Sequence, residues 1–452
     1  MTASAARPRP ARRALDELSL PVDASLLDEL TADEPGWLIE DRHAAFDAWS
    51  HLPGESNLLY TTYIDLRAAD LEGASIDVER RAGSVDGGGL PGDADAIMEI
   101  VDGRLTTLAV SDAAAAISLR PLLDDLDAVR DELLATDALI PDDKFAQLTR
   151  AFWSQGVLVD IPAGVRLDKP IVIRWGLGAP GRALLTRTLV RLGAGASASI
   201  VEEFVPAPGS DPTAAQSFFA GTMEVTLGDG ANLQVASLQE LPANVVAFQH
   251  RAASLGEAAT LQWALAQLGG RLVRSRVDNR LVGDRSSVRQ VEIVFGAEEQ
   301  LFDLTSYTTH IGKDTTGDLL SKAALLEKAR TYLKGLITIE RSANGTDSFL
   351  GEFGMNLSKA ARSVAIPSLE IDQPDCRRAA HSSSVGPIDE TQLFYLESRG
   401  IPPDEARKFI VLGFLEPVVA RVPLASAQDR LRELLEEKWI AGTDGVAGEA
   451  AA

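Results

Sequence analysis

The sequence has little cysteine or histidine and no long apolar run. Its single cysteine, Cys376, excludes an intramolecular disulfide and excludes a site with several thiolate ligands made by this chain alone. The five histidines are too few for a His-rich metal site. No stretch of about 18 apolar residues occurs, so we expect neither a membrane span nor a membrane partner. Together these features predict a reducing, cytoplasmic compartment.

Positive charge and nucleotide-binding motifs are also scarce. Lys and Arg number 43 against 66 Asp and Glu, a formal net charge of −23, which would repel a phosphate backbone and predicts no nucleic-acid partner. The nearest approach to a P-loop, residues 311–314 (IGKD), lacks the upstream glycine and the hydroxyl that a P-loop needs. No G-x-S-x-G motif is present either. The residues therefore do not support ATP hydrolysis or esterase chemistry by this chain.

Short alternating strands and a repeated corner begin at about Phe152. The strings LGAGASASI, LGDGANLQV and LGEAATLQW share a glycine after leucine, and a looser LVGDRSSVRQ follows. These corner glycines are Gly193, Gly228, Gly256 and Gly283, separated by 35, 28 and 27 residues. A period near 28 favours the stacked coils of a β-solenoid. A β-sandwich, with turns every 8 to 12 residues and no long repeat, is the alternative.

Helical patterns flank this β region. We predict a mainly helical region over residues 1–150, with 1–30 disordered, a solenoid core over 151–366 and a helical domain over 367–452. Asp389 can cap a first C-terminal helix that Gly400 ends. The segment Ser321–Leu333 has helical composition but equally fits an irregular coil edge. The expected fold class is mainly β, a solenoid between two helical regions.

Several strings in the C-terminal third carry a family resemblance. They include SLEI at Ser368, Ala380-His381 followed by Val385-Gly386, and RGIP at Arg399. The segment AFWSQGV at Ala151 matches the same family at the entry into the repeats. This pattern resembles the SufB/SufD family of iron–sulfur cluster assembly proteins. The resemblance implies a right-handed parallel β-helix between helical ends.

The resemblance also implies a function and a set of partners. It implies a non-enzymatic scaffold of the SUF complex, paired with a SufB-like paralogue through the β-helix and docked to a SufC-like ATPase through its C-terminal helices. A cysteine desulfurase system would supply sulfur indirectly, and the complex would carry a transient iron–sulfur cluster and a reduced flavin bound through the partner. No cofactor would be tightly bound to this chain alone. Pairing of two copies in a homodimer remains open.

The residues favour the SufD branch of the family. A SufB-type chain would carry a cysteine in the β-helix and an acid after the histidine, whereas here the predicted core has no cysteine and Ser382 follows His381. His381 either ligates iron of the nascent cluster at the partner interface or only stabilises that interface. Cys376 lies too far upstream to match a family position and is treated as incidental.

The candidate ATPase-docking residues lie on the two helices after His381. They are Phe394, Tyr395, Arg399, Gly400, Phe409 and Phe414. Two other classes of function stay open. A β-helix carbohydrate-active enzyme would need carboxylates stacked across coils, and a pure interaction protein would dock the ATPase without touching cluster chemistry.

Overall fold

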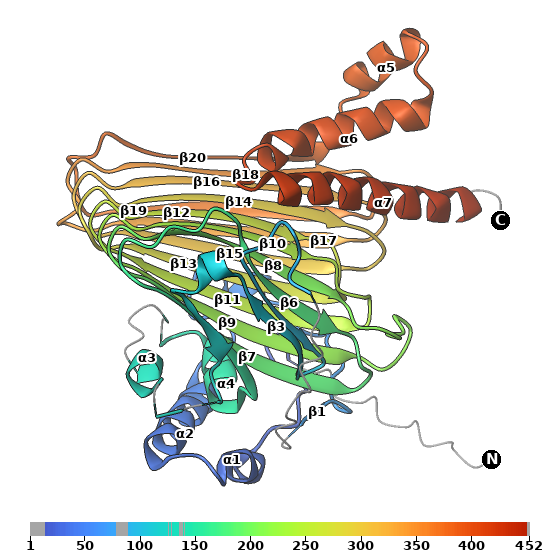
Figure 1. Ribbon diagram of the computed structural model, residues 1–452. Helices are drawn as coiled ribbons and strands as arrows, with labels where there is room; N and C mark the ends of the chain where they lie inside the picture. Colours follow the sequence, from blue (N-terminus) through green and yellow to red (C-terminus); the bar gives the residue numbers. More distant parts are fainter. Residues whose placement is uncertain are drawn as a thin grey trace, which may run out of the picture.

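The computed structural model describes residues 14–77, 89–124, 126–127, 129–134, 139 and 141–449, with the side chains of residue 132 and of 443–449 left out. Among these residues no helix combines the length and the apolar character that a membrane span requires. Figure 1 shows the chain wound into a long stack of strands, with helices against two different faces of the stack.

The strands form two long sheets, and from β5 onward successive strands alternate between one sheet and the other. In spatial order the first sheet contains β19 (Arg362–Ile371), β17 (Arg330–Ile339), β15 (Leu301–His310), β13 (Leu272–Leu281), β11 (Val245–Leu255), β9 (Ser217–Leu227), β7 (Arg182–Leu192), β5 (Gln155–Ile161) and β4 (Ser118–Pro121), with β1 (Ser75–Ile76) beside β7. The second sheet contains β20 (Arg378–Pro387), β18 (Asp347–Asn356), β16 (Thr316–Leu325), β14 (Ser287–Gly296), β12 (Thr260–Gln267), β10 (Asn232–Gln239), β8 (Ser197–Pro206), β6 (Ile171–Leu177), β2 (Ala96–Val101) and β3 (Arg104–Val110).

From β5 onward each strand pairs in parallel with the strand two further along the chain, which makes a solenoid of about eight turns. This confirms the predicted β-solenoid rather than the sandwich. Alternate side chains point inward, and the apolar ones, such as Val157, Val225 and Val273, form a continuous core. At the corners the chain passes so close to the previous coil that a Cβ on Gly283 would lie 2.1 Å from the backbone nitrogen of Glu257. The repeated glycine is therefore required by the stacking.

The N-terminal region packs on the outer face of the first sheet. Its helices are α1 (Ala24–Thr31), α2 (Gly36–His51), α3 (Arg130–Leu134) and α4 (Lys144–Phe152), with short 3-10 turns η1 (Thr61–Tyr63) and η2 (Asp112–Ala114). The predicted disorder of residues 1–30 is wrong for its second half, because Asp23 caps α1 and Leu27 is buried; residues 1–13 lie outside the described part. The prediction of a mainly helical 1–150 also missed β1 to β4, which extend both sheets.

The solenoid runs further than the predicted boundary at residue 366. Strand β19 continues through Pro367 to Ile371, and β20 adds a further strand before the helices begin. Proline is tolerated here because β19 is an edge strand, and an edge strand need not donate every N–H to a neighbour. The ambiguous segment Ser321–Leu333 is also sheet: Ala323, Leu325 and Leu333 point into the core from β16 and β17.

The C-terminal helices lie on the outer face of the second sheet (Figure 1). They are α5 (Glu390–Ser398), α6 (Pro403–Val419) and α7 (Ala425–Glu449). Apolar residues of α6 and α7, including Val411, Leu415 and Leu431, pack on Val291, Ile293 and other outward side chains of the sheet in one cluster. Helix α5 contacts α6 and stands away from the stack of strands (Figure 1). The two helical regions therefore cover different sheets and leave the end of the solenoid free.

Candidate functional site

The free end of the solenoid is formed by β19 and β20. Each is the last strand of its sheet, so each has a pairing partner on one side only. His381 lies on β20 in register with Leu350 of β18, whose side chain is part of a buried cluster inside the solenoid. Because residues in register lie on the same face of parallel strands, His381 belongs to the inward column. It is exposed, since no further coil covers it.

Cys376 occupies the turn between β19 and β20. Its half-buried side chain packs, like Leu369 and Ala379, against the apolar cluster that closes the interior at this end. Ala379 is the residue two before His381 on the same inward face. Within the described ranges no group of three or more His, Cys, Asp or Glu side chains is arranged to hold a metal ion.

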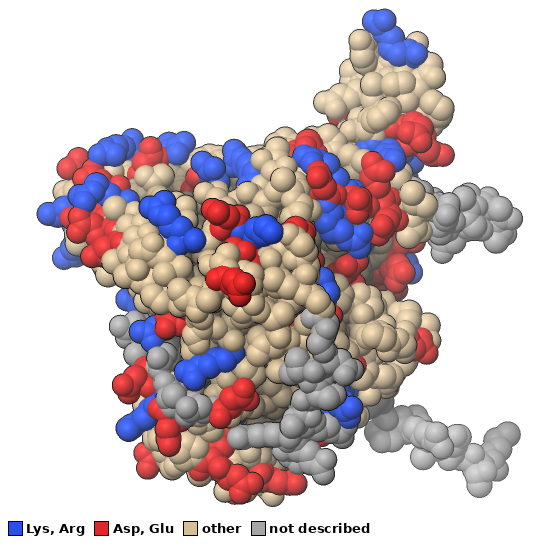
Figure 2. Space-filling model, in the orientation of Figure 1, with Lys and Arg blue, Asp and Glu red and all other residues tan. Residues whose placement is uncertain are grey.

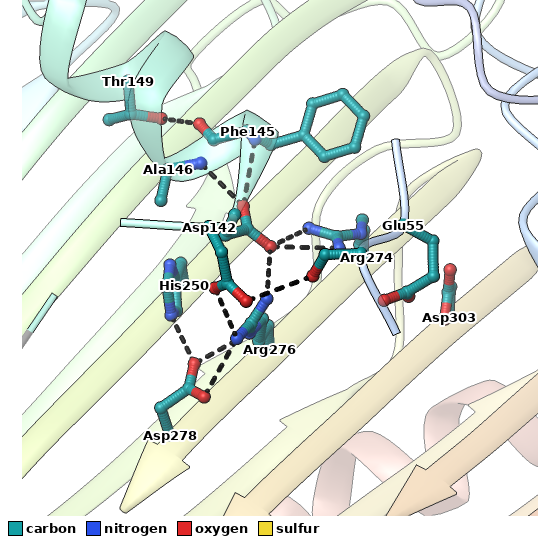
Figure 3. Close-up of polar contacts among 12 residues, drawn as sticks. Glu55, Asp142, Phe145, Ala146, Thr149, His250, Arg274, Arg276, Asp278 and Asp303 are labelled. Carbon is teal, nitrogen blue, oxygen red and sulfur yellow. Dashed lines mark hydrogen bonds and ion pairs between the residues drawn. The ribbon is translucent and has the colours of Figure 1, made fainter. Parts of the chain in front are cut away.

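A second polar feature, a buried ion network, joins the N-terminal region to the first sheet (Figure 3). Asp143 caps α4, where its Oδ1 accepts hydrogen bonds from the backbone of Phe145 and Ala146. Its Oδ2 accepts from Arg274 at 3.1 Å and from Arg276 at 3.0 Å. Burial alone would raise the pKa of Asp143, but the two guanidinium groups outweigh it and hold this pKa well below its usual range.

The network continues along β13 and β11. Arg276 Nε donates to Asp278 at 2.8 Å, and Nε2 of His250 lies 2.6 Å from the same carboxylate. Despite its burial, Asp278 has a lowered pKa, because Arg276 and His250 stabilise its charged form. The sequence analysis singled out none of these residues and missed this network. The signal was the alternation R-S-R-V-D at Arg274–Asp278, which puts three charged side chains on one face of a strand.

A neighbouring buried cluster fixes the loop after α2. Lys334 of β17 lies 2.6 Å from Asp303 and 3.4 Å from Glu55, and the Tyr60 hydroxyl donates to the backbone oxygen of Gly335 at 2.8 Å. These charges are paired within the chain. The arrangement therefore serves as a clamp between the N-terminal region and the sheet, and it presents no group to a substrate.

The predicted docking residues lie on the α5–α6 arm, defined here as residues 389–419. Asp389 caps α5 by accepting from Thr391, and Gly400 ends it with a φ of +87°. The side chains of Phe394, Tyr395 and Phe409 are 71%, 56% and 56% exposed, and Arg399, which lies over the Tyr395 ring, is exposed as well.

Phe414 is placed differently from the other five docking candidates. It is half-buried against the solenoid, with Lys322 Nζ 4.5 Å from its ring centre and 2.6 Å from its backbone oxygen. The structure therefore leaves Phe394, Tyr395, Arg399, Gly400 and Phe409 accessible on the arm, and these five residues are called the arm surface below. It gives Phe414 a role in attaching α6 to β16.

A family model described as "SUF system FeS cluster assembly, SufBD core domain" matches residues 176–414, more than half of the chain. The chain belongs to the SufB/SufD family. The matched span runs from the end of β6 into α6 and so contains the strands from β7 to β20, His381 and all five residues of the arm surface.

Individual members of the SufB/SufD family match about two thirds of this chain. The chain is 28% identical to the iron–sulfur cluster assembly protein SufD of Bacillus subtilis over 69% of this chain and 70% of that protein. It is 27% identical to an iron–sulfur cluster assembly SufBD family protein of Staphylococcus epidermidis over 67% of this chain, and the match spans 64% of that relative. A SufBD family protein of Staphylococcus aureus is also 27% identical, with 62% of its length covered. The similarity to SufD agrees with the branch expected from Ser382 and from the absence of cysteine in the predicted core 151–366.

The paired aspartates at the start of α4 give a test of the buried network. Asp143→Asn should lower the free energy of unfolding by about 3–5 kcal/mol, because it leaves Arg274 buried without its ion-pair partner and leaves the buried Arg276 with Asp278 but without Asp143. Asp142→Asn should cost less than about 1 kcal/mol, because Asp142 is 54% exposed and lies 3.6 Å from Arg276. Denaturant unfolding monitored by circular dichroism measures both, and equal losses would contradict the clamp.

Asp143 also predicts how the stability of the fold depends on pH. Because the folded pKa of Asp143 is depressed, its stabilisation is present above the unfolded pKa of about 3.9 and is lost as the pH falls through the folded value. The wild-type chain should therefore lose stability on acidification below about pH 4, whereas Asp143→Asn should show a shallower loss.

Proposed function

We propose that this chain is a SufD-like scaffold of a SUF iron–sulfur cluster assembly complex, working without enzymatic activity of its own. The observation that carries the proposal is the uncovered end of the solenoid, which places His381 at an edge that a second chain can complete. The family match supports assembly of iron–sulfur clusters as the process. The proposed place of action is the cytoplasm, alongside a cysteine desulfurase system that supplies sulfur.

The open end fits pairing with a SufB-like paralogue. Edge strands present unpaired N–H and C=O groups that another chain can bind by adding a strand. Strand β20 has no proline before its last residue, Pro387, whereas Pro367 interrupts the donors of β19. We therefore expect the paralogue to pair along β20, over His381.

His381 would ligate iron of a nascent cluster held between the two chains. A neutral imidazole suits iron, and the remaining ligands would come from the paralogue. The cluster is the cargo of the complex, so this chain alone would hold no tightly bound cofactor. A reduced flavin would act through the partner.

The arm surface fits docking of a SufC-like ATPase. Its exposed aromatic side chains and Arg399 are the residue types that carry most binding energy at protein interfaces. The ATPase would supply the nucleotide site that the sequence of this chain lacks.

The test of the arm surface is a double substitution. Tyr395→Ala with Phe409→Ala should weaken binding of the ATPase at least about 30-fold, because the loss of even one anchor of about 2 kcal/mol has that effect. Leu58→Ala, at a side chain 87% exposed in the N-terminal region, should leave binding unchanged. Isothermal titration calorimetry measures both, and equal affinities of the two variants would refute the arm as the docking site.

The test of His381 uses the assembled complex. His381→Ala should lower the yield of anaerobically reconstituted cluster by at least about tenfold, because it removes a ligand that no neighbour replaces. His51→Ala, at an exposed position of α2, serves as the control. Iron and sulfide analysis is done on complexes whose subunit ratio is first checked by mass. Full cluster yield in an intact His381→Ala complex would leave the histidine with a stabilising role only.

A further inference from the structure

A small polar cavity lies inside the solenoid, among the coils that contain β7 to β11. Its polar lining includes Glu202 of β8, Gln249 and Arg251 of β11, and Thr186 and Thr188 of β7. Apolar side chains form part of the remaining wall. The space is large enough for about one water molecule. These five side chains belong neither to the ion network on the outer face nor to the open end.

Strand alternation places these polar groups in the interior. On β11, Gln249 and Arg251 share a face with Ala247 and Ala253, which belong to the apolar core of the solenoid. Gln249 is 4% exposed and Arg251 is 2% exposed. The same alternation turns Glu202 of β8 toward the interior, where it is buried as well. The cavity is therefore an island of polar groups within an apolar core.

Arg251 joins the two sheets across this interior. Its Nη2 donates to Glu202 Oε2 at 2.6 Å and to Ser237 Oγ of β10 at 2.9 Å. Its Nη1 donates to Gln249 Oε1 at 3.2 Å. The Ser237 hydroxyl in turn donates to the same Glu202 oxygen at 2.9 Å. Glu202 thus neutralises Arg251, and the pair carries no net charge.

Two donors of this cluster are left without an acceptor. Nε of Arg251 and Nε2 of Gln249 are buried and have no hydrogen-bond partner among the residues that the structure describes. Both side chains line the cavity. Leaving a buried donor unpaired is costly, and folded proteins rarely do so. The two donors therefore indicate an acceptor within the cavity.

A glycine keeps the cavity open. Gly221 of β9 is in register with Gln249, so it lies on the inward face of the sheet. A Cβ on Gly221 would lie 2.8 Å from Cζ of Phe219 and 3.0 Å from Thr186 Oγ1, and both of these side chains line the cavity. A methyl group at position 221 would therefore occupy the cavity or push the Phe219 ring into it.

The chemistry of the lining selects the occupant. A dry or apolar cavity would leave Nε of Arg251 and Nε2 of Gln249 unpaired. A small anion could accept from both donors, but it would share the cavity with the carboxylate of Glu202. A water molecule can accept from the two donors and also donate to this carboxylate or to a threonine hydroxyl, and buried waters typically make about three hydrogen bonds.

We propose that this cavity is a binding site for one ordered water molecule, held by Arg251 Nε and Gln249 Nε2 as donors and by Glu202 and the threonine hydroxyls as acceptors. The water completes a polar bridge from β11 of the first sheet to β8 and β10 of the second. The site lies apart from the surfaces assigned to partners, and the proposal does not depend on cluster assembly.

A crystal structure of the full chain, at a resolution that shows ordered water, is the direct test. It should show one isolated density peak within about 3.2 Å of both Arg251 Nε and Gln249 Nε2. No density between these two atoms would overturn the proposal.

Two further data sets distinguish water from the other occupants. Anomalous scattering from crystals soaked in bromide, and from crystals pressurised with xenon, should show no peak in the cavity. A bromide peak would identify an anion site, and a xenon peak would identify a dry apolar cavity. Either peak would overturn the proposal.

A matched pair of glycine substitutions ties the density to this cavity. Gly221→Ala should remove the water peak, because the added methyl group or the displaced Phe219 ring takes its place. Gly36→Ala should keep the peak, because a Cβ on Gly36 meets nothing within 4 Å. A peak that persists unchanged in Gly221→Ala would overturn the proposal. If Gly221→Ala fails to fold, the wild-type, bromide and xenon data still decide.

Discussion

Parallel, in-register pairing between successive coils is the constraint on which the rest of the molecule depends. It stacks side chains of one inward position into columns that run the length of the solenoid, such as the column from Glu292 through Ser321 to Glu352. A slip of one residue would turn every inward side chain outward. The same pairing brings the backbone at Gly283 against the previous coil. The register therefore decides which side chains face the interior. It also decides which side chains of β20 lie on the inward face at the open end.

The molecule covers its two outer faces and leaves one end uncovered. Apolar clusters attach the N-terminal region to the first sheet and α6 and α7 to the second. The N-terminal region is held in addition by the buried charges of Asp143, Arg274 and Arg276. Figure 2 shows acidic and basic side chains mixed over the visible surface, with both signs close together near the C-terminal helices.

The solenoid could be predicted from the sequence because the corner glycines recur at a spacing close to the length of one coil. Its end was placed at residue 366 because Pro367 was taken as a break, although an edge strand accepts proline. The ion network could not be located from the sequence, since Asp143 and Arg276 are 133 residues apart and only the fold brings them together.

The claim that the open end is an interface can be tested by hydrogen exchange of the backbone amides. The amides of β20 are compared in the isolated chain and in a mixture with a SufB-like partner at saturating concentration. The account predicts slower exchange at residues 378–386 in the mixture, with the amides of α1 and α2 unchanged. Unchanged exchange along β20 in a mixture shown by mass to contain the bound partner would contradict it.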